Sequence, residues 1–379
     1  MTRISPQAYI IAARRTAIGL TGGLHRHRRV EELAAMALQA ALTGARLSPK
    51  DVQQLVIGNA SEGGNPARLI GLTAGLPETS PAYTIDRQCA SGLDAILTAI
   101  RLVESGDAEV VAAGGAESLS TAPWRLARPH GTAQTPRFLE AGNSDFEADE
   151  TLARRGQITR KKQDAYALAA RQAGAATGGA KAEIVAMRPE AAEARDEWLG
   201  YGLEAAEIAD LLPFCEEGGT LTSGNTSPSG DGAAMVVVVS QACYQRLGRP
   251  PALCRLASAA TGARPGSESE APAQAVLKLR ERLNGDARRP VATHELNESS
   301  AAQAIAFRDQ LAIPADRFNP GGGALAHGRP FGASSAVVVV RLFARLLASG
   351  ASIKGQLGLA ATGAHGGLGV AALFETHLT

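Results

Sequence analysis

Short apolar runs alternate with helical patterns along the first third of the chain. The runs have the length of buried strands, and between them apolar residues recur every three or four positions, as on one face of a helix. The pattern predicts strands over residues 9–19, 55–60 and 109–113, and helices over residues 30–42, 66–72 and 93–103. Alternating strands and helices are typical of a mixed, largely parallel sheet covered by helices, so we expect an α/β fold.

The pattern weakens between residues 122 and 226, where Ser, Gly, Pro, Arg and Glu are common. One clear helix is predicted there, from Thr159, whose hydroxyl suits an N-cap, to about Ala175. We therefore expect this stretch to be an insertion between two segments of one sheet domain.

Regular alternation returns after this insertion. The aliphatic runs Val236–Val239 and Val337–Val340 are far too short to cross a bilayer, and both predict buried strands. The second half again runs strand, helix, strand and ends in a strand pair within residues 357–374. The expected units are an N-terminal half of residues 1–121 and 227–251, a loop domain of residues 122–226, and a C-terminal half of residues 252–379.

The composition is that of a soluble globular protein, with 45% hydrophobic and 20% charged residues among 379. A net charge of +1 gives no reason to expect nucleic acid or a membrane as a partner. Arg14 and Arg15 interrupt the first apolar run, so no signal peptide is expected. The four cysteines have no metal-site spacing, which favours a reduced, cytoplasmic protein without a metal centre.

Cys89 occupies a predicted turn between a short β-type run and a helix. The positive end of a helix dipole favours a thiolate, and the thiolate is the nucleophilic form of cysteine. The small residues Ala90, Ser91 and Gly92 would allow a substrate or another backbone to approach the sulfur. The alternative is a buried structural cysteine, because free cysteine is among the most buried residue types.

The sequence around this cysteine, DRQCASGL over residues 86–93, resembles the nucleophile motif of the thiolase superfamily. Residues 106–118 and 223–234 are similar to the segment after that motif and to the family's glycine-rich segment. The resemblance, to acetyl-CoA acetyltransferases and 3-ketoacyl-CoA thiolases, covers almost the whole chain. It implies a thiolase-like αβαβα layered fold with two similar mixed-sheet halves and an inserted loop domain. It also implies an acyltransferase that uses a coenzyme A thioester as its substrate and needs no cofactor.

In this family four loops form the active site, and two of them are matched here. Cys89 matches the nucleophile, and Asn297 matches an asparagine that holds an oxyanion-site water. Acyl transfer needs a thiolate nucleophile, donors for developing oxyanions and a base near neutrality. The alternative for Asn297 is a buried structural asparagine that caps a turn.

The third loop departs from the family, because Arg329 stands where the family has a histidine. Arginine cannot act as a general base, but it can donate hydrogen bonds to an oxyanion and lower the pKa of a nearby thiol. His327 lies two residues earlier, where an extended backbone would turn it to the same face. It is expected either to enter the substrate site or to be a packed or surface histidine.

The fourth loop departs as well, because Gly363 replaces the family's second cysteine, the base for the α-carbon. His365 falls at the position of that motif's glycine and is either a surrogate base or a residue tolerated on a roomy loop. We therefore expect acyl-Cys89 to form readily. Condensation or thiolysis is expected to be slow and to depend on a displaced histidine, His365 first and His327 second.

Further matches and departures concern the substrate. Ser227 matches a residue near the pantetheine arm of coenzyme A. Asp145 and Ser300 fall where the family has Met and Phe against the acyl group. Together with Gly363, they imply a larger and wetter pocket, and with Arg329 a polar or carboxylated acyl chain.

Two differences from the family pattern bear on what the protein binds: the carrier of the acyl group and a second copy of the chain. Glu216 and Glu217 stand where the family has basic residues near the nucleotide end of coenzyme A, so an acyl-carrier thioester remains open beside acyl-CoA. The chain looks short after Trp124, where tetrameric thiolases join two dimers, so we expect a homodimer. The alternative function is a catalytically degenerate homologue that binds acyl thioesters or serves as a partner subunit.

Overall fold

The computed structural model describes residues 8–123, 145–177, 183–185, 195–202, 204–215, 218–264, 267–283, 289–347 and 353–378. In these ranges, 10 strands form one sheet with the order β4-β3-β5-β6-β1-β7-β10-β9-β8, and β2 pairs with β6 beside this path. The strands are β1 (Ala8–Arg15), β2 (Gly19–Leu20), β3 (Gln54–Gly58), β4 (Ala82–Ile85), β5 (Val110–Glu117), β6 (Gly230–Ser240), β7 (Ala252–Gly262), β8 (Val291–Asn297), β9 (Leu357–Ala364) and β10 (Leu368–His377).

The sheet consists of two halves of the same build. In the N-terminal half β3 runs parallel to β5, and β5, β6 and β1 continue antiparallel. In the C-terminal half β8 runs parallel to β9, and β9, β10 and β7 continue antiparallel. A single residue pair, Ile10 with Leu253, joins the halves through β1 and β7. The predicted pair of similar halves is therefore confirmed.

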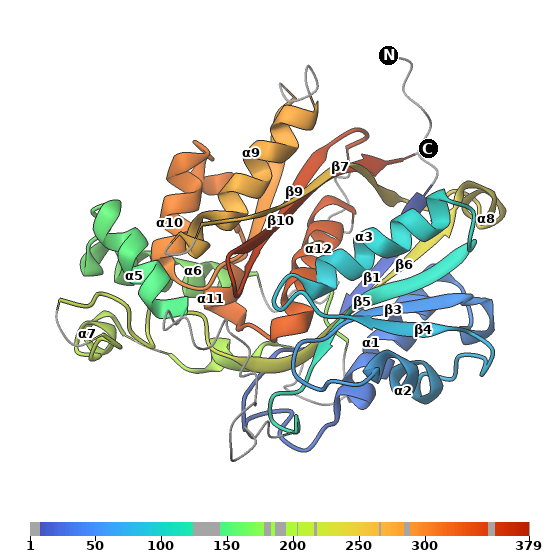
Figure 1. Ribbon diagram of the computed structural model, residues 1–379, viewed down its shortest axis with the longest axis horizontal. Helices are drawn as coiled ribbons and strands as arrows, with labels where there is room; N and C mark the ends of the chain where they lie inside the picture. The colour runs from blue at the N-terminus through green and yellow to red at the C-terminus, as the bar shows by residue number, and fades with distance from the viewer. Residues whose placement is uncertain are drawn as a thin grey trace, which may run out of the picture.

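Helices cover both halves and fill the space between them (Figure 1). Helices α1 and α2 pack on one face of the N-terminal half, α9 and α10 pack on the C-terminal half, and α3 and α12 lie between the two. This arrangement is the αβαβα layering. The helices are α1 (Val30–Ala45), α2 (Pro66–Thr73), α3 (Ser91–Glu104), α5 (Asp145–Arg155), α6 (Arg160–Ala176), α7 (Ala205–Ala209), α8 (Gln241–Arg246), α9 (Ala271–Leu283), α10 (Ala301–Gln310), α11 (Gly323–His327) and α12 (Phe331–Leu347).

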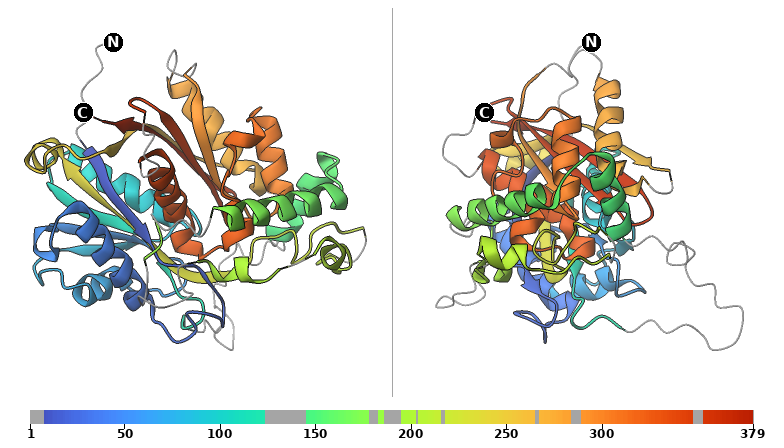
Figure 2. Two further views of the ribbon diagram at one scale, coloured as in Figure 1. Left: turned by 180° about the vertical axis from the view of Figure 1, so that it is seen from behind. Right: turned by 90° about the vertical axis from the view of Figure 1, so that its left-hand side faces the viewer.

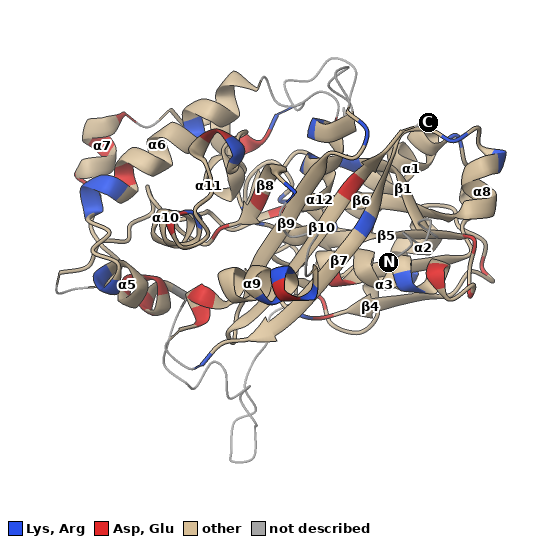
Figure 3. Cartoon of the chain, turned by 90° about the horizontal axis from the view of Figure 1, so that it is seen from above, with Lys and Arg blue, Asp and Glu red and all other residues tan. Residues whose placement is uncertain are grey.

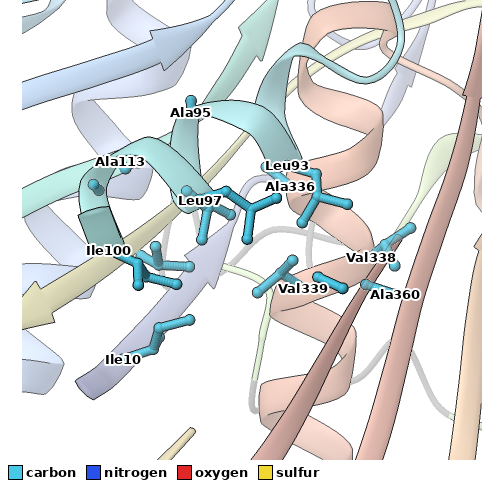
Figure 4. Close-up of a cluster of buried hydrophobic side chains, with 14 of the residues drawn as sticks. Ile10, Leu93, Ala95, Leu97, Ile100, Ala113, Ala336, Val338, Val339 and Ala360 are labelled. Atoms are coloured by element: carbon cyan, nitrogen blue, oxygen red, sulfur yellow. The ribbon is translucent and has the colours of Figure 1, made fainter. Parts of the chain in front are cut away.

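One predicted strand is wrong, because Val337–Val340 lies inside helix α12. The helix is buried between the two sheet halves, so it is apolar around almost its whole circumference (Figure 4). A short continuous apolar run cannot be assigned to a strand or a buried helix by its period alone. Packing against both halves outweighs the preference of valine for strands.

Several predicted helix boundaries are confirmed. Pro66 begins α2, and Thr159 is the N-cap of α6, where its hydroxyl accepts a hydrogen bond from the Lys162 N–H at 3.4 Å. Helix α3 ends before Gly106, whose φ of 84° lies in the region that glycine adopts without strain.

The inserted segment, with α5, α6 and α7, lies at the end of the molecule away from α1 and α2 (Figures 1 and 2). The predicted boundaries at residues 121/122, 226/227 and 251/252 fall outside the strands. A buried ion cluster ties the insertion to the sheet, since Arg15 on β1 pairs with Glu183 at 2.7 Å and with Asp196 at 2.6 Å. Although burial alone would raise it, the pKa of Asp196 lies below its ordinary value because of Arg15.

Charged residues of both signs are interspersed over the helices, for example on α9 (Figure 3). Within the described ranges no helix combines the length and the apolar character that crossing a bilayer requires.

Candidate active site

Cys89 lies in the tight turn between β4 and α3, as predicted. Gln88, directly before it, has a φ of 51°, a left-handed conformation that few side chains adopt. Ser91 holds this turn, because its hydroxyl accepts a hydrogen bond from the Arg87 N–H at 2.7 Å and donates one to the Gln88 carbonyl at 2.6 Å. Cys89 is thereby fixed at the N-terminal end of α3, with 6% of its surface exposed.

The N-terminal end of α3 packs directly against α12. A Cβ at Gly92 would lie 2.8 Å from the backbone nitrogen of Ala336, so only glycine permits this approach. The Leu93 N–H donates a hydrogen bond to the Ser335 hydroxyl at 2.9 Å. Helix α12 has the same position in the C-terminal half that α3 has in the N-terminal half. The first turns of the two helices therefore meet at one site.

Cys89 opens onto a small pocket between the two halves and the insertion. Its volume is about 30 Å³, which is room for a few atoms, since one buried water needs about 10–15 Å³. The pocket is lined by Cys89, Ala148, Asp149, Glu268, Ser269, Asn297, Ser299, Gln303, Arg329, Gly363, Ala364 and His365. The structure thus brings together five of the residues singled out from the sequence: Cys89, Asn297, Arg329, Gly363 and His365.

Asn297 is the last residue of β8, and its side-chain amide donates to the Thr362 hydroxyl on β9 at 3.3 Å. Glu298, which follows it, is fully buried and accepts hydrogen bonds from the Leu325 N–H at 3.2 Å and from the Asn319 amide at 2.9 Å. Burial raises the pKa of Glu298 to about 7. These contacts fix the loop that presents Asn297 to the pocket.

Arg329 lies in the connection from α11 to α12. Its N–H donates to the Pro228 carbonyl at 2.8 Å, and its carbonyl accepts from the Gly230 N–H at 3.2 Å. The guanidinium carbon lies 5.6 Å from the centroid of the Phe331 ring. Hydrogen bonds to the glycine-rich segment before β6 therefore fix the backbone of Arg329, and from there its guanidinium reaches the pocket.

Gly363 and His365 come from the end of β9 and from the turn, residues 365–367, that leads to β10. A Cβ at Gly363 would lie 3.0 Å from Pro272 Cγ and 3.6 Å from Gln303 Nε2. Neighbouring side chains therefore occupy the space that the missing side chain leaves. The pocket is polar and has a volume of about 30 Å³, and a size greater than that of the family's pocket stays a prediction.

The side of the pocket that Asp149 on α5 forms was not predicted from the sequence. Asp149 on α5 is buried, and its carboxylate accepts hydrogen bonds from the Ser299 hydroxyl at 2.5 Å and from the Ser269 hydroxyl. Gln303 joins the same two segments, because its amide donates to the Ser269 carbonyl at 3.2 Å and accepts from the Ser299 N–H at 2.9 Å. Ser299 and Gln303 lie beside Asn297 in the sequence and could have been found by that proximity.

Glu268 also lines the pocket without having been predicted. It begins the 3₁₀ helix η3 (Glu268–Glu270), which leads directly into α9. Its Oε2 atom is buried and has no hydrogen-bond partner in the part of the chain that the structure describes. A Cβ at Gly367 would lie 3.2 Å from Glu268 Cγ, so this side chain passes the turn that carries His365.

Three predicted substrate residues do not line the pocket. His327 is buried in α11 with Nδ1 at 2.9 Å from the Gly328 carbonyl, and burial together with Arg341 lowers its pKa to about 3. The Ser227 hydroxyl donates to the Glu298 carbonyl at 2.9 Å. The Ser300 hydroxyl is the N-cap of α10 and accepts from the Gln303 N–H at 3.1 Å. The three side chains hold the scaffold of the site, because their polar atoms form hydrogen bonds with the backbone around them.

Trp124, Glu216 and Glu217 lie outside the described residues, as does the side chain of Asp145. The other three cysteines are free, and burial raises the pKa of each of them, that of Cys254 to about 12. No three His, Cys, Asp or Glu side chains in the described segments come together as a metal site would require.

Comparison with known proteins agrees with this fold. The family models of the thiolase N-terminal and C-terminal domains match residues 8–242 and 251–376. An acetyl-CoA acetyltransferase of Chromobacterium violaceum is 35% identical over 393 residues, covering 97% of this chain and 98% of that protein.

Among solved structures, an acetyl-CoA acetyltransferase of Bacillus anthracis superimposes with a TM-score of 0.87 at 28% identity, covering 98% of this chain and 99% of that one. The Acat5 thiolase of Ascaris suum in complex with coenzyme A gives 0.88 at 27% identity, covering 98% and 100%. The chain therefore belongs to the thiolase family and is a thiolase-type acyltransferase.

Proposed function

We propose that this chain transfers an acyl group from an acyl-CoA thioester through an acyl-thioester on Cys89. The observation that carries the proposal is the shared pocket, in which Cys89 at the start of α3 meets Asn297 and Arg329. Relatives named acetyl-CoA acetyltransferases and the coenzyme A complex of a structural neighbour support this substrate class.

Acylation needs few groups. The Cys89 thiolate, favoured by the N-terminal end of α3, attacks the thioester carbonyl, and coenzyme A leaves as a thiol after taking a proton. The amide of Asn297 and the guanidinium of Arg329 are hydrogen-bond donors at the same pocket and can stabilise the oxyanion that forms. His365 is the imidazole at this pocket, and we assign it the proton that moves between the thiols of Cys89 and coenzyme A.

The pocket favours a short acyl group. Its volume of about 30 Å³ leaves no room for a long chain next to Cys89. Its polar lining, which includes Asp149, Ser269 and Ser299, favours an acetyl or small polar acyl group over an aliphatic one. The carboxylates of Asp149 and Glu268 argue against an acyl chain that carries its own carboxylate, since like charges would oppose each other.

We further propose that the protein works as a homodimer in the cytoplasm. Strand β4 is the last of the described strands at one side of the sheet, and the exposed apolar residues Leu69, Leu72 and Tyr83 lie on it and on α2. An open strand edge with apolar neighbours is suited to pairing with a second copy. The four free thiols favour a reducing compartment.

The rival function is a homologue that binds acyl thioesters without completing a reaction. The presence of Arg329 and Gly363 at two positions that carry family catalysis favours it. Because binding alone forms no covalent bond, the intact mass of the protein distinguishes the two functions.

The test mixes the protein with acetyl-CoA, stops the reaction with acid and measures the intact mass. We expect the mass of one acetyl group on the unmodified protein and none on Cys89→Ser. Asn297→Ala should form the same adduct about 100- to 1,000-fold more slowly, as for a lost oxyanion donor. The control Cys243→Ser should form it normally, because Cys243 is buried on α8, outside the pocket. A protein that binds acetyl-CoA without an adduct would establish the rival function.

A further inference from the structure

Carbon–carbon bond formation at this site requires a group that removes a proton from the α-carbon of a second thioester. Arg329 cannot accept a proton, and Gly363 has no side chain. A base is therefore missing at both positions where the family would supply proton transfer.

We propose that Glu268 is the base that takes the α-proton. This inference rests on the proposed function, because the group that the resulting carbanion attacks is acyl-Cys89. Glu268 lines the same pocket as Cys89 and Asn297, and the pocket is small enough that its lining groups face one acyl unit. The buried Oε2 of Glu268 has no hydrogen-bond partner among the described residues, so it is available to a reacting group.

The second carboxylate of the pocket is not available in this way. Asp149 accepts hydrogen bonds from the Ser299 hydroxyl at 2.5 Å and from the Ser269 hydroxyl. Hydrogen bonds to a carboxylate stabilise its charged form and make it a weaker base. Of the two acids at the pocket, Glu268 is thus the one with a carboxylate oxygen that no hydrogen bond from the described residues occupies.

The segment that carries Glu268 is held from several sides. Glu270 forms an ion pair with Arg155 on α5, and the Ser269 carbonyl accepts from the Gln303 amide at 3.2 Å. A fixed backbone with one unpartnered carboxylate oxygen is the arrangement expected of a positioned base. His365 reaches the pocket from the neighbouring turn, where a Cβ at Gly367 would lie 3.2 Å from Glu268 Cγ.

The reaction balances without a further co-reactant. The Glu268 carboxylate takes a proton from the α-carbon of acyl-CoA, and that carbon attacks the carbonyl carbon of acyl-Cys89. The new carbon–carbon bond forms, the bond to Cys89 Sγ breaks, and Cys89 leaves as a thiolate. The proton on Glu268 then passes to that thiolate or to water. In thiolysis Glu268 returns the proton to the α-carbon, while His365 takes the proton from the thiol of coenzyme A.

Exchange of the α-protons of acetyl-CoA in D₂O, followed by mass spectrometry, measures this step without requiring condensation. Glu268→Gln should lower exchange and condensation by about 100- to 10,000-fold, while acyl-Cys89 forms as in the unmodified protein. The control Glu281→Gln, at an exposed position near the far end of α9, should leave exchange and acylation unchanged. Added formate should restore part of the exchange in Glu268→Ala, because it can occupy the vacated space and accept the proton. His365→Ala should retain α-proton exchange.

Normal exchange in Glu268→Gln, or no exchange in the unmodified protein, would overturn the assignment of Glu268. Loss of acylation together with exchange in Glu268→Gln would overturn it too, because the residue would then be structural. If His365→Ala alone abolishes exchange, His365 is the base. Absence of acyl-Cys89 while exchange is intact would instead refute the acyl-Cys89 mechanism and leave Glu268 as the base.

Discussion

The surroundings of each thiol give Cys89 its distinct character. Burial raises the pKa of Cys215, Cys243 and Cys254, and Cys254 reaches about 12, so these thiols stay protonated near neutral pH. Cys89 lies at the start of a helix of 14 residues, beside a pocket that also holds the Arg329 cation. Both features favour a thiolate.

We therefore predict that iodoacetamide labels Cys89 first, as followed by peptide mapping over time at neutral pH. Cys215 is the natural internal control, because it is partly exposed while Cys243 and Cys254 are buried. Faster labelling of Cys215 would mean that access, and not thiolate character, decides reactivity here. At higher pH the difference in labelling rate between Cys89 and the other cysteines should narrow, because the other thiols begin to ionise.

Individual site residues were predictable where a local motif carries them. Cys89, Asn297, Arg329, Gly363 and His365 each follow from a short segment with a recognisable pattern, and the fold brings these segments together. Asp149 and Glu268 come from α5 and η3, whose docking depends on contacts between distant parts of the chain, such as Asp149 with Ser269. No local pattern contains that information.

At the scale of elements, helices α12 and α10 show that the position of an element in the fold decides how its residues are used. The run Val337–Val340 suggested a strand, yet it forms the buried middle of α12 because both sheet halves cover it. Ser300 was predicted to lie against the acyl group, yet its hydroxyl caps the N-terminal end of α10. Whether such a side chain caps a helix or packs into a core depends on where its element lies in the fold. The local sequence does not show that position.

The connection before α12 and the end of β9 together allow a test by restoration. Arg329→His with Gly363→Cys would return both family groups to the site. We predict that this double change, made in Glu268→Gln, raises the condensation rate by about 100-fold or more, as expected for a regained general base. A Cβ at Gly363 would lie 3.0 Å from Pro272 Cγ, so Pro272 must move slightly to admit the new side chain.

The control for this experiment is Arg329→His alone, which supplies no base at position 363. The rate of condensation from acetyl-CoA distinguishes the variants, and the adduct on Cys89 confirms that each is folded. If the double change has no effect while acylation persists, the site differs from that of its relatives by more than these two residues.

At the scale of the whole molecule, the layered architecture was predictable because it follows from repeated strand and helix patterns in both halves. The internal duplication explains the site, since α3 and α12 stand in equivalent places and deliver Cys89 and Arg329 from opposite halves. The inserted segment adds Asp149 as a third contribution. The pocket therefore exists only when all three parts are assembled.

Assembly of two copies is the last prediction. Among the described residues no strand pairs with the outer side of β4. Beside it, Leu69, Leu72 and Tyr83 are 50%, 42% and 36% exposed and present an apolar edge on the half that carries Cys89. We predict a dimer by light scattering in dilute buffer. Tyr83→Asp should shift it to the monomer, because a charge at the strand edge opposes pairing. The control Ile353→Asp, at a side chain 61% exposed elsewhere, should leave the dimer intact. A stable tetramer, or a dimer indifferent to Tyr83→Asp, would show that the copies meet through another surface.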